Sequence, residues 1–301
     1  MITIDKIIIK TICENTASIP MVMAEWGLSM EIIIDGKRFL FDTGAGNINV
    51  LRHNMMVMNV LPNEIDHLIL SHGHQDHTGG LRYFLEQRAF QSSLRPIKIY
   101  AHPEVLTPKY VQSPLVKGYR FFGCPFPIEE LQRYGAEFEF SKDPIELNDS
   151  LMTTGEVPMT NKYESVGNTF FLKPGDNYIE DQEMIDDQAL IIKTDKGLLI
   201  ILGCAHRGMI NTIHHAQKIT GIEKVHMVIG GTHLANASKE RMDETIKEIK
   251  RLDIKKVGVS HCTGLNSSAH LREALGPNIF FYNNAGTFIQ FPQGEMIANS
   301  F

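Results

Sequence analysis

Three histidines and one aspartate lie within six consecutive positions, in the run SHGHQDHTGG at residues 71–80. The run directly follows a short apolar segment that is typical of a buried strand. Alternate residues leaving a strand point to the same side, so His72 and His74 can face one point, and Asp76 and His77 a second point beside it. Imidazole and carboxylate groups together suit zinc, iron or manganese. The order and placement favour a metal site over a polar surface loop, and the fold must bring further ligands to it.

Three later histidines each follow a predicted strand: His206 in GCAHRG, His233 in GGTHL and His261 in SHCTG. Because loops at one rim of a sheet structure converge, we expect these side chains to approach residues 71–80. Cys204 is a further candidate, since a thiolate is a good zinc ligand. The alternative for Cys204 is a small buried residue, which is the usual role of an unpaired cysteine.

Predicted strands cluster in each half of the chain, and predicted helices follow them. The predicted elements are strands over 2–10, 67–70, 225–229 and 257–259, hairpins over 31–41, 189–202 and 280–291, and helices from 81, over 208–220, from 238 and from Ser267 or Ser268 to 276. This order indicates two sheets packed face to face with helices outside. We expect one domain over 1–301, with a Pro- and aromatic-rich insertion at about 103–148 that is either an irregular packed excursion or a lid.

The composition excludes several classes of protein. With 43% hydrophobic and 21% charged residues, the chain can build a core and is not disordered. Its net charge of −6 argues against general nucleic-acid binding, which needs a basic field. No apolar run approaches the roughly 20 residues of a membrane helix, and no signal-peptide pattern is visible. The four cysteines show no disulfide spacing. We therefore expect a cytoplasmic protein without membrane or nucleic-acid partners, and the sequence leaves its oligomeric state open.

The run at 72–77, the turn FDTG at 41–44 and the late His261 resemble the metallo-β-lactamase superfamily. The resemblance covers essentially the whole chain. It implies an α/β (α+β) fold, a four-layer αββα sandwich with one or two metals at one edge. It also implies a ligand set, with the first metal on His72 and His74 and the second on Asp76, His77 and His261.

A narrower branch, the dihydropterin–ribofuranosylaminobenzene phosphate synthase-like one, is similar at six motifs. They lie at residues 71–81, 154–158, 186–189, 203–208, 230–234 and 261–264. The reaction that names the branch joins a dihydropterin methyl diphosphate to a ribosylated aminobenzene phosphate and releases diphosphate. The resemblance thus implies a small-molecule substrate, and a phosphorylated one.

The chain departs from the superfamily pattern at two ligands. The usual third histidine of the first metal has no match, and the usual bridging aspartate is Cys204. His206 can replace one or both, and we prefer it to Cys204. His233 stays open between a ligand, a substrate contact and a core residue. We assign catalytic roles to Asp76, His206 and His233.

Asp42 is interpreted as a residue that holds the histidine loop by hydrogen bonds. The competing interpretation is the Asp-Thr-Gly of an aspartic protease. That mechanism needs two carboxylates that share a proton, and the chain holds a single Asp-Thr-Gly.

Three residues are candidates for binding a phosphate group. Arg207 precedes a predicted helix, whose N-terminus favours an anion, and Thr263 precedes another. Lys162 adds a positive charge near two glutamates. The alternative for Arg207 and Lys162 is solvated surface.

Three functions follow from these observations. The first is a metal-dependent enzyme on a phosphate- or diphosphate-bearing small molecule, such as a pterin-type transferase. The second is a general hydrolase of phosphodiesters, esters or lactones that uses a metal-bound hydroxide, since a divalent metal lowers the pKa of bound water to about 7. The third is a non-catalytic metal or ligand binder, which the intact run at 72–77 disfavours. The cofactor is one or two divalent ions, zinc ahead of manganese, iron or magnesium.

Overall fold

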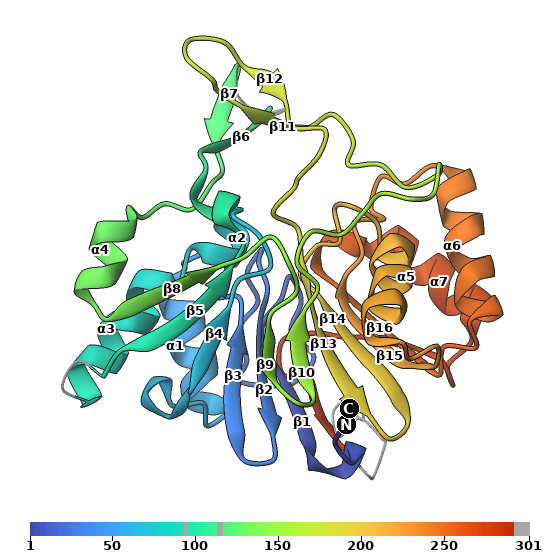
Figure 1. Ribbon diagram of the computed structural model, residues 1–301, viewed down its shortest axis with the longest axis horizontal. Helices are drawn as coiled ribbons and strands as arrows, with labels where there is room; N and C mark the ends of the chain where they lie inside the picture. Colours follow the sequence, from blue (N-terminus) through green and yellow to red (C-terminus); the bar gives the residue numbers. More distant parts are fainter. Residues whose placement is uncertain (93–94, 113–116, 292–301) are drawn as a thin grey trace.

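Two seven-stranded β-sheets lie face to face, and helices cover the outer side of each (Figure 1). This computed structural model describes residues 1–92, 95–112 and 117–291. The predicted four-layer αββα sandwich is confirmed. None of the helices in these ranges has the length and apolarity needed to cross a bilayer.

The first sheet has the order β18-β1-β2-β3-β4-β5-β8. Its strands are β1 (Ile7–Cys13), β2 (Ser29–Ile34), β3 (Lys37–Phe41), β4 (His67–Ile69), β5 (Ile97–Ala101), β8 (Ala136–Phe140) and β18 (Phe288–Gln290). The outer helices on this side are α1 (Ile48–Val57), α3 (Leu81–Ser92) and α4 (Ile128–Arg133). The predicted turn between β2 and β3 is present, with Asp35 and Gly36 both at positive φ.

The second sheet has the order β17-β16-β15-β14-β13-β10-β9. Its strands are β9 (Glu146–Asn148), β10 (Leu151–Thr153), β13 (Ala189–Thr194), β14 (Gly197–Leu202), β15 (Val225–Gly231), β16 (Lys256–Ser260) and β17 (Phe280–Tyr282). The outer helices are α5 (Met209–Thr220), α6 (Lys239–Arg251) and α7 (Leu265–Leu275). Gly221 ends α5 in the left-handed conformation, and the Ser238 side chain caps α6.

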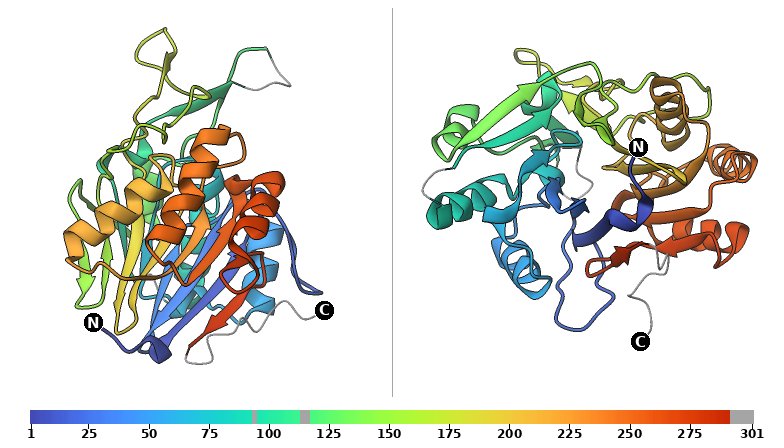
Figure 2. Two further views of the ribbon diagram at one scale, coloured as in Figure 1. Left: turned by 90° about the vertical axis from the view of Figure 1, so that its right-hand side faces the viewer. Right: turned by 60° about the horizontal axis from the view of Figure 1, so that its bottom comes forward.

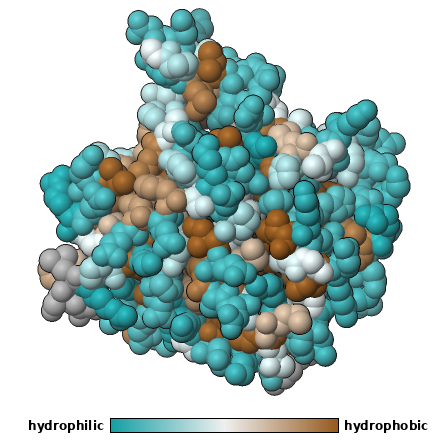
Figure 3. Space-filling view, in the orientation of Figure 1, coloured by the Kyte–Doolittle hydropathy of each residue, from teal (hydrophilic) through white to brown (hydrophobic). Residues whose placement is uncertain are grey.

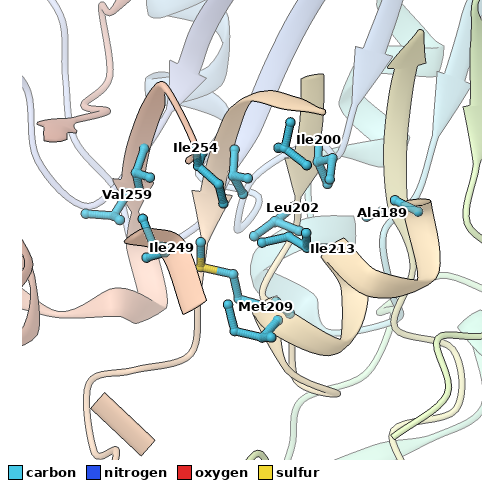
Figure 4. Close-up of a cluster of buried hydrophobic side chains, with 14 of the residues drawn as sticks. Ala189, Ile200, Leu202, Met209, Ile213, Ile249, Ile254 and Val259 are labelled. Carbon is cyan, nitrogen blue, oxygen red and sulfur yellow. The ribbon is translucent and has the colours of Figure 1, made fainter. Parts of the chain in front are cut away.

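Apolar side chains fill the three spaces between the four layers. A central cluster joins the two sheets and includes Ile32, Phe41 and Ile201. A second cluster packs the first sheet against its helices, and a third packs the second sheet against α5, α6 and α7 (Figure 4). The view in Figure 3 is largely hydrophilic, with apolar groups scattered over it. Burial of alternate strand residues on both faces therefore holds the sandwich together.

A third, smaller sheet projects from one edge of the sandwich (Figures 1 and 2). Its strands, in the order β12-β11-β6-β7, are β6 (Lys109–Gln112), β7 (Tyr119–Phe121), β11 (Phe170–Leu172) and β12 (Ile179–Glu180). The insertion expected at 103–148 therefore has different bounds. β8 and β9 join the two main sheets because their apolar residues, such as Ala136, complete the main clusters, and the projecting sheet takes half its strands from 170–180.

Three predicted elements differ in the structure. The hairpin expected over 280–291 does not form, because β17 pairs with β16 and β18 pairs with β1 in the other sheet. The first strand begins at Ile7, since residues 4–6 form a 3₁₀ turn. α7 begins at Leu265 after Gly264, and the hydroxyl of Ser268 instead donates back to the Gly264 carbonyl at 2.6 Å.

The direction of the central strands determines where the site forms. β3, β4, β5 and β8 run parallel in the first sheet, and β14, β15, β16 and β17 run parallel in the second. The carboxyl ends of parallel neighbours lie at one edge. The short 3₁₀ turn at His261–Thr263 and helix α2 (Gln75–Thr78) follow such ends, and α2 lies at the upper edge of the sandwich, below the projecting sheet, in Figure 1.

Truncating a side chain in the central cluster tests this packing. Ile201→Ala should lower the free energy of unfolding by about 2–5 kcal/mol, because it leaves a cavity between two sheets that cannot close together. Ile179→Ala, at a half-exposed position of β12, should change it by less than about 0.5 kcal/mol. Urea unfolding measures both, and equal losses would contradict the assigned packing.

Candidate metal centre

Four loops from both sheets converge at one edge of the sandwich. The loop after β4 carries His72, His74, Asp76 and His77, and the loops after β14, β15 and β16 carry the remaining candidates. Their side-chain atoms form three groups within 4.8 Å, and the members of one group come from positions up to 185 apart, from 76 to 261. The groups are His72 with His74 and His206, His72 with His77 and Cys204, and Asp76 with His77 and His261.

The first group consists of three buried imidazoles. His72 Nε2 lies 3.0 Å from His74 Nδ1 and 3.2 Å from His206 Nε2. Burial lowers the pKa of all three well below the ordinary value, and the neighbouring imidazoles lower it further. These rings are therefore neutral, which is the form that binds metals.

The second group adds a carboxylate. His261 Nε2 lies 3.1 Å from Asp76 Oδ2, and His77 Nε2 lies 3.9 Å from Asp76 Oδ1. Burial raises the pKa of Asp76, but the His77 and His261 side chains lower it overall. Burial likewise opposes the charge on His77, yet the carboxylates of Asp42 and Asp76 raise its pKa to about 9. The second group thus pairs the ionised Asp76 carboxylate with an imidazole that the two carboxylates favour in its charged form.

Cys204 lies between the two groups. Its Sγ is 3.2 Å from His77 Nε2, and it shares a group with His72. Burial raises the pKa of this thiol well above the ordinary value. The structure therefore brings together both alternatives considered for the missing ligands: His206 completes the first group, and Cys204 faces both.

Asp42 makes the hydrogen bonds expected of it. Its Oδ1 accepts from the Ser71 backbone N–H at 2.7 Å, and its Oδ2 accepts from the Ser71 hydroxyl and from His77 Nδ1, both at 2.6 Å. The Ser71 hydroxyl can in turn accept from His72 Nδ1, 2.9 Å away. Because the Nδ1 atoms of both histidines are held this way, their Nε2 atoms face the cluster.

Four non-glycine residues of the site have positive φ. They are Asp42 at 58°, Ala205 at 51°, His233 at 50° and His261 at 52°. This conformation costs free energy for residues with a Cβ atom and persists where surrounding contacts enforce it. The strain lies in the turns that direct these side chains toward one another.

A buried ion pair connects the projecting sheet to the histidine loop. Lys109 Nζ of β6 donates to Asp186 Oδ1 at 2.6 Å and lies 3.7 Å from Asp181 Oδ2. Asp186 Oδ2 accepts from the Gly73 backbone N–H at 2.8 Å. Since Gly73 separates two histidines of the first group, this network fixes the loop from the side opposite Asp42.

His233 lies beside the first group without completing it. Its ring centroid is 4.3 Å from that of His206, and its Nδ1 has no hydrogen-bond partner in the described part of the chain. Its backbone N–H donates to Cys262 Sγ at 3.2 Å. The arrangement leaves this imidazole available to a bound molecule.

The three candidates for phosphate binding are placed differently from one another. The Arg207 guanidinium donates to the carbonyls of Val157 and Glu183, so these donors are already used. The buried Thr263 hydroxyl lies 2.8 Å from that of Thr232. Lys162 is exposed, and within the described ranges no hydrogen bond or ion pair links it to the histidines. Arg207 and Thr263 therefore make contacts within the protein, and Lys162 is solvated.

Several residues near the site were not among the candidates predicted from the sequence. Trp26 donates from Nε1 to Asp76 Oδ2 at 3.1 Å, while 61% of the residue is exposed. Burial raises the pKa of Asp187 to about 7, and its Oδ2 accepts from the Arg207 backbone N–H at 2.9 Å. Lys109 lies in the Pro- and aromatic-rich segment, where no motif marked it as a residue of the site. Only the pair Asp186-Asp187 lay in one of the six motifs quoted above.

The chain resembles known proteins over nearly its whole length. The model of the family described as the metallo-beta-lactamase superfamily matches residues 27–209. A 7,8-dihydropterin-6-methyl-4-(beta-D-ribofuranosyl)-aminobenzene-5'-phosphate synthase of Methanocaldococcus jannaschii is 33% identical over 297 residues, which is 96% of this chain and 98% of that protein. An uncharacterized protein of the same organism is 31% identical over 93% of this chain and 99% of its own.

Among solved structures, a metal-dependent hydrolase of the beta-lactamase superfamily superposes with a TM-score of 0.77. The alignment covers 94% of this chain and 98% of that chain at 24% identity. At this identity the likeness concerns the fold.

Removing the charge of Lys109 tests the link between the projecting sheet and the loop. Lys109→Met should lower the free energy of unfolding by about 3–5 kcal/mol, because it leaves buried carboxylates without their partner. The matched control is Lys98→Met, which breaks an exposed pair with Glu139 and should cost at most about 1 kcal/mol. Urea unfolding compares the two variants. A loss of unfolding free energy for Lys109→Met no larger than that for Lys98→Met would show that the Lys109 ion pair does not stabilise the fold.

Proposed function

Because the chain belongs to the metallo-β-lactamase superfamily and is a metal-dependent hydrolase or transferase, we propose that it acts on a phosphate- or diphosphate-bearing small molecule. The observation that carries the proposal is the pair of adjacent ligand groups that Cys204 joins. Two cations side by side suit a substrate with several anionic oxygens.

The residues fit one or two divalent ions. The buried Asp76 Oδ1 has no hydrogen-bond partner in the described ranges, and the neutral His72 and His206 direct Nε2 atoms at each other. A divalent cation between these atoms would give each of them the electrostatic partner that it lacks. We propose that His72, His74 and His206 hold one ion and Asp76, His77 and His261 hold the other, with Cys204 in reach of both. The mixture of nitrogen, sulfur and oxygen favours zinc.

A bound divalent ion supplies Lewis acidity and lowers the pKa of bound water. The protein's own residues supply orientation. We assign Asp76 and His206 to positioning the reacting group, since both lie in the ligand groups. His233, with its unpartnered Nδ1, is the candidate for donating or accepting a proton on the substrate.

The relative with the synthase name supports a pterin-type transfer with release of diphosphate. In that reaction an amine attacks carbon and the carbon–oxygen bond to diphosphate breaks, so the departing oxygens need cationic partners. The alternative is hydrolysis of phosphodiesters, esters or lactones, which the same ligand groups also suit. The two differ in whether water or an amine reaches the substrate.

Turnover by metal-loaded protein tests the assignment. We expect cleavage of bis-p-nitrophenyl phosphate or of a lactone if the protein is a hydrolase, and diphosphate release only with an amine acceptor if it is a transferase. His74→Ala should abolish either activity and reduce the bound metal, because it removes a ligand of the first group. The exposed His270→Ala is the control, and full activity in both variants would eliminate metal catalysis at this site.

Replacing Asp42 tests its control of the ligands. Asp42→Asn should weaken metal binding by about 10- to 100-fold, because an amide cannot accept hydrogen bonds from both Ser71 and His77 as the carboxylate does. Competition with a chelator, read by elemental analysis, measures the affinity. Asp35→Asn, in an exposed turn, should leave it unchanged. Equal metal affinity in the two variants would mean that Asp42 does not orient the ligands.

A further inference from the structure

A pocket of about 340 Å³ adjoins the candidate metal centre on the side of His233. His233 and Cys262 form one wall, and the chain segments at 163–169 and 235–238 form the others. Most of the lining side chains outside the metal centre are polar or small. The pocket therefore reaches from the ring that flanks the first ligand group to the start of α6.

One cationic side chain lines this pocket. Arg241 is only 6% exposed, and its Nη1 donates to the Ser165 carbonyl at 2.9 Å. Its Nε and Nη2 atoms are buried and have no hydrogen-bond partner in the ranges that the structure describes. These two atoms form the side edge of the guanidinium, where two parallel N–H groups match two oxygens of one anion.

The neighbouring acid does not occupy that edge. Glu164 lies near Arg241, but its Oε1 accepts from the Ile210 backbone N–H at 2.9 Å and its Oε2 accepts from that of Asn211 at 2.8 Å. Among the described residues, no carboxylate oxygen lies within ion-pair distance of the Arg241 guanidinium. A buried charge without a partner is costly, so the free edge indicates a site for an anionic ligand.

The start of α6 adds to the positive potential. Asn236, Ala237 and Ser238 line the pocket directly before this 13-residue helix. The positive end of the helix dipole therefore faces the same space as Arg241. Ser165, Thr169 and Asn236 supply further polar groups for a third anionic oxygen.

We propose that this pocket binds a phosphate monoester group of the substrate, which Arg241 grips through Nε and Nη2. The inference rests on the proposed function, because it places the phosphate at one end of a molecule whose other end reacts at the histidine cluster. His233 lies between the two ends. The tetrahedral dianion is favoured over a carboxylate because it offers a third oxygen to the helix start. Arg241 is thereby a binding residue that selects phosphorylated substrates.

Calorimetry with phenyl phosphate on metal-loaded protein tests the proposal. Arg241→Gln should bind it at least tenfold more weakly than the wild type, and Arg241→Lys should be weakened as well, because a lysine loses the two-pronged geometry. Arg251→Gln, an exposed arginine on the same helix, is the matched control and should bind as the wild type does. Unchanged affinity in both Arg241 variants would overturn the proposal, and so would benzoate binding as tightly as phenyl phosphate.

A crystal structure with phenyl phosphate keeps the test independent of how the variants fold. We expect the phosphate against Nε and Nη2 of Arg241, and density only at the histidine cluster would overturn the proposal. The proposed function fails separately, through the absence of turnover in the wild-type protein. Arg241-dependent binding without turnover would support the phosphate site while rejecting the catalytic assignment.

Discussion

The carboxylate of Asp42 is the contact on which the site depends. Both of its oxygens bind the segment that carries the histidines, through the Ser71 backbone and hydroxyl and through His77 Nδ1. Fully buried, it offers these donors a charged acceptor where water cannot compete. The residue adopts a positive φ to do so, and the two sheets around it make that strain tolerable.

A second set of contacts holds the same loop from the other side. Lys109 and Asp186 connect the projecting sheet to Gly73, so the histidine loop is fixed between the sandwich and an element that covers its edge. Loops placed on rigid strands are where binding groups concentrate. The two supports hold the loop that carries four of the seven candidate ligands, and the carboxyl ends of β14 and β16 bring the other three to it.

His233 lines the Arg241 pocket, and its ring lies 4.3 Å from that of His206 in the first ligand group. A substrate with a reactive end and a phosphorylated end fits this division. In the proposed function, the candidate metal ligands at one end would stabilise charge in the reaction, whereas the guanidinium edge and the start of α6 would recognise the phosphate. The exposed indole of Trp26, which donates to Asp76, adds a flat apolar surface beside the second ligand group.

Much of this could be predicted from sequence because it depends on local pattern. The periodicity located β13, β14, α5 and α6, and the spacing at 72–77 identified the ligand types. The hairpin over 280–291 was predicted incorrectly because local pattern cannot tell which sheet a strand will join. The sequence could not show which of Arg207 and Arg241 has hydrogen-bond partners, because those partners are distant in the chain. The Arg207 guanidinium donates to two carbonyls, whereas Nε and Nη2 of Arg241 have no partner in the described ranges.

The sequence by itself thus determined the alternation of strands and helices, the chemistry of the histidine run and the carboxylate that supports it. The tertiary structure decided which ligands share a group, that Cys204 lies between the groups, and that Arg241 keeps a free edge beside them. The physical reason is that propensity and hydrophobic period act over a few residues. Distances between side chains on different sheets follow from the packing of the whole sandwich.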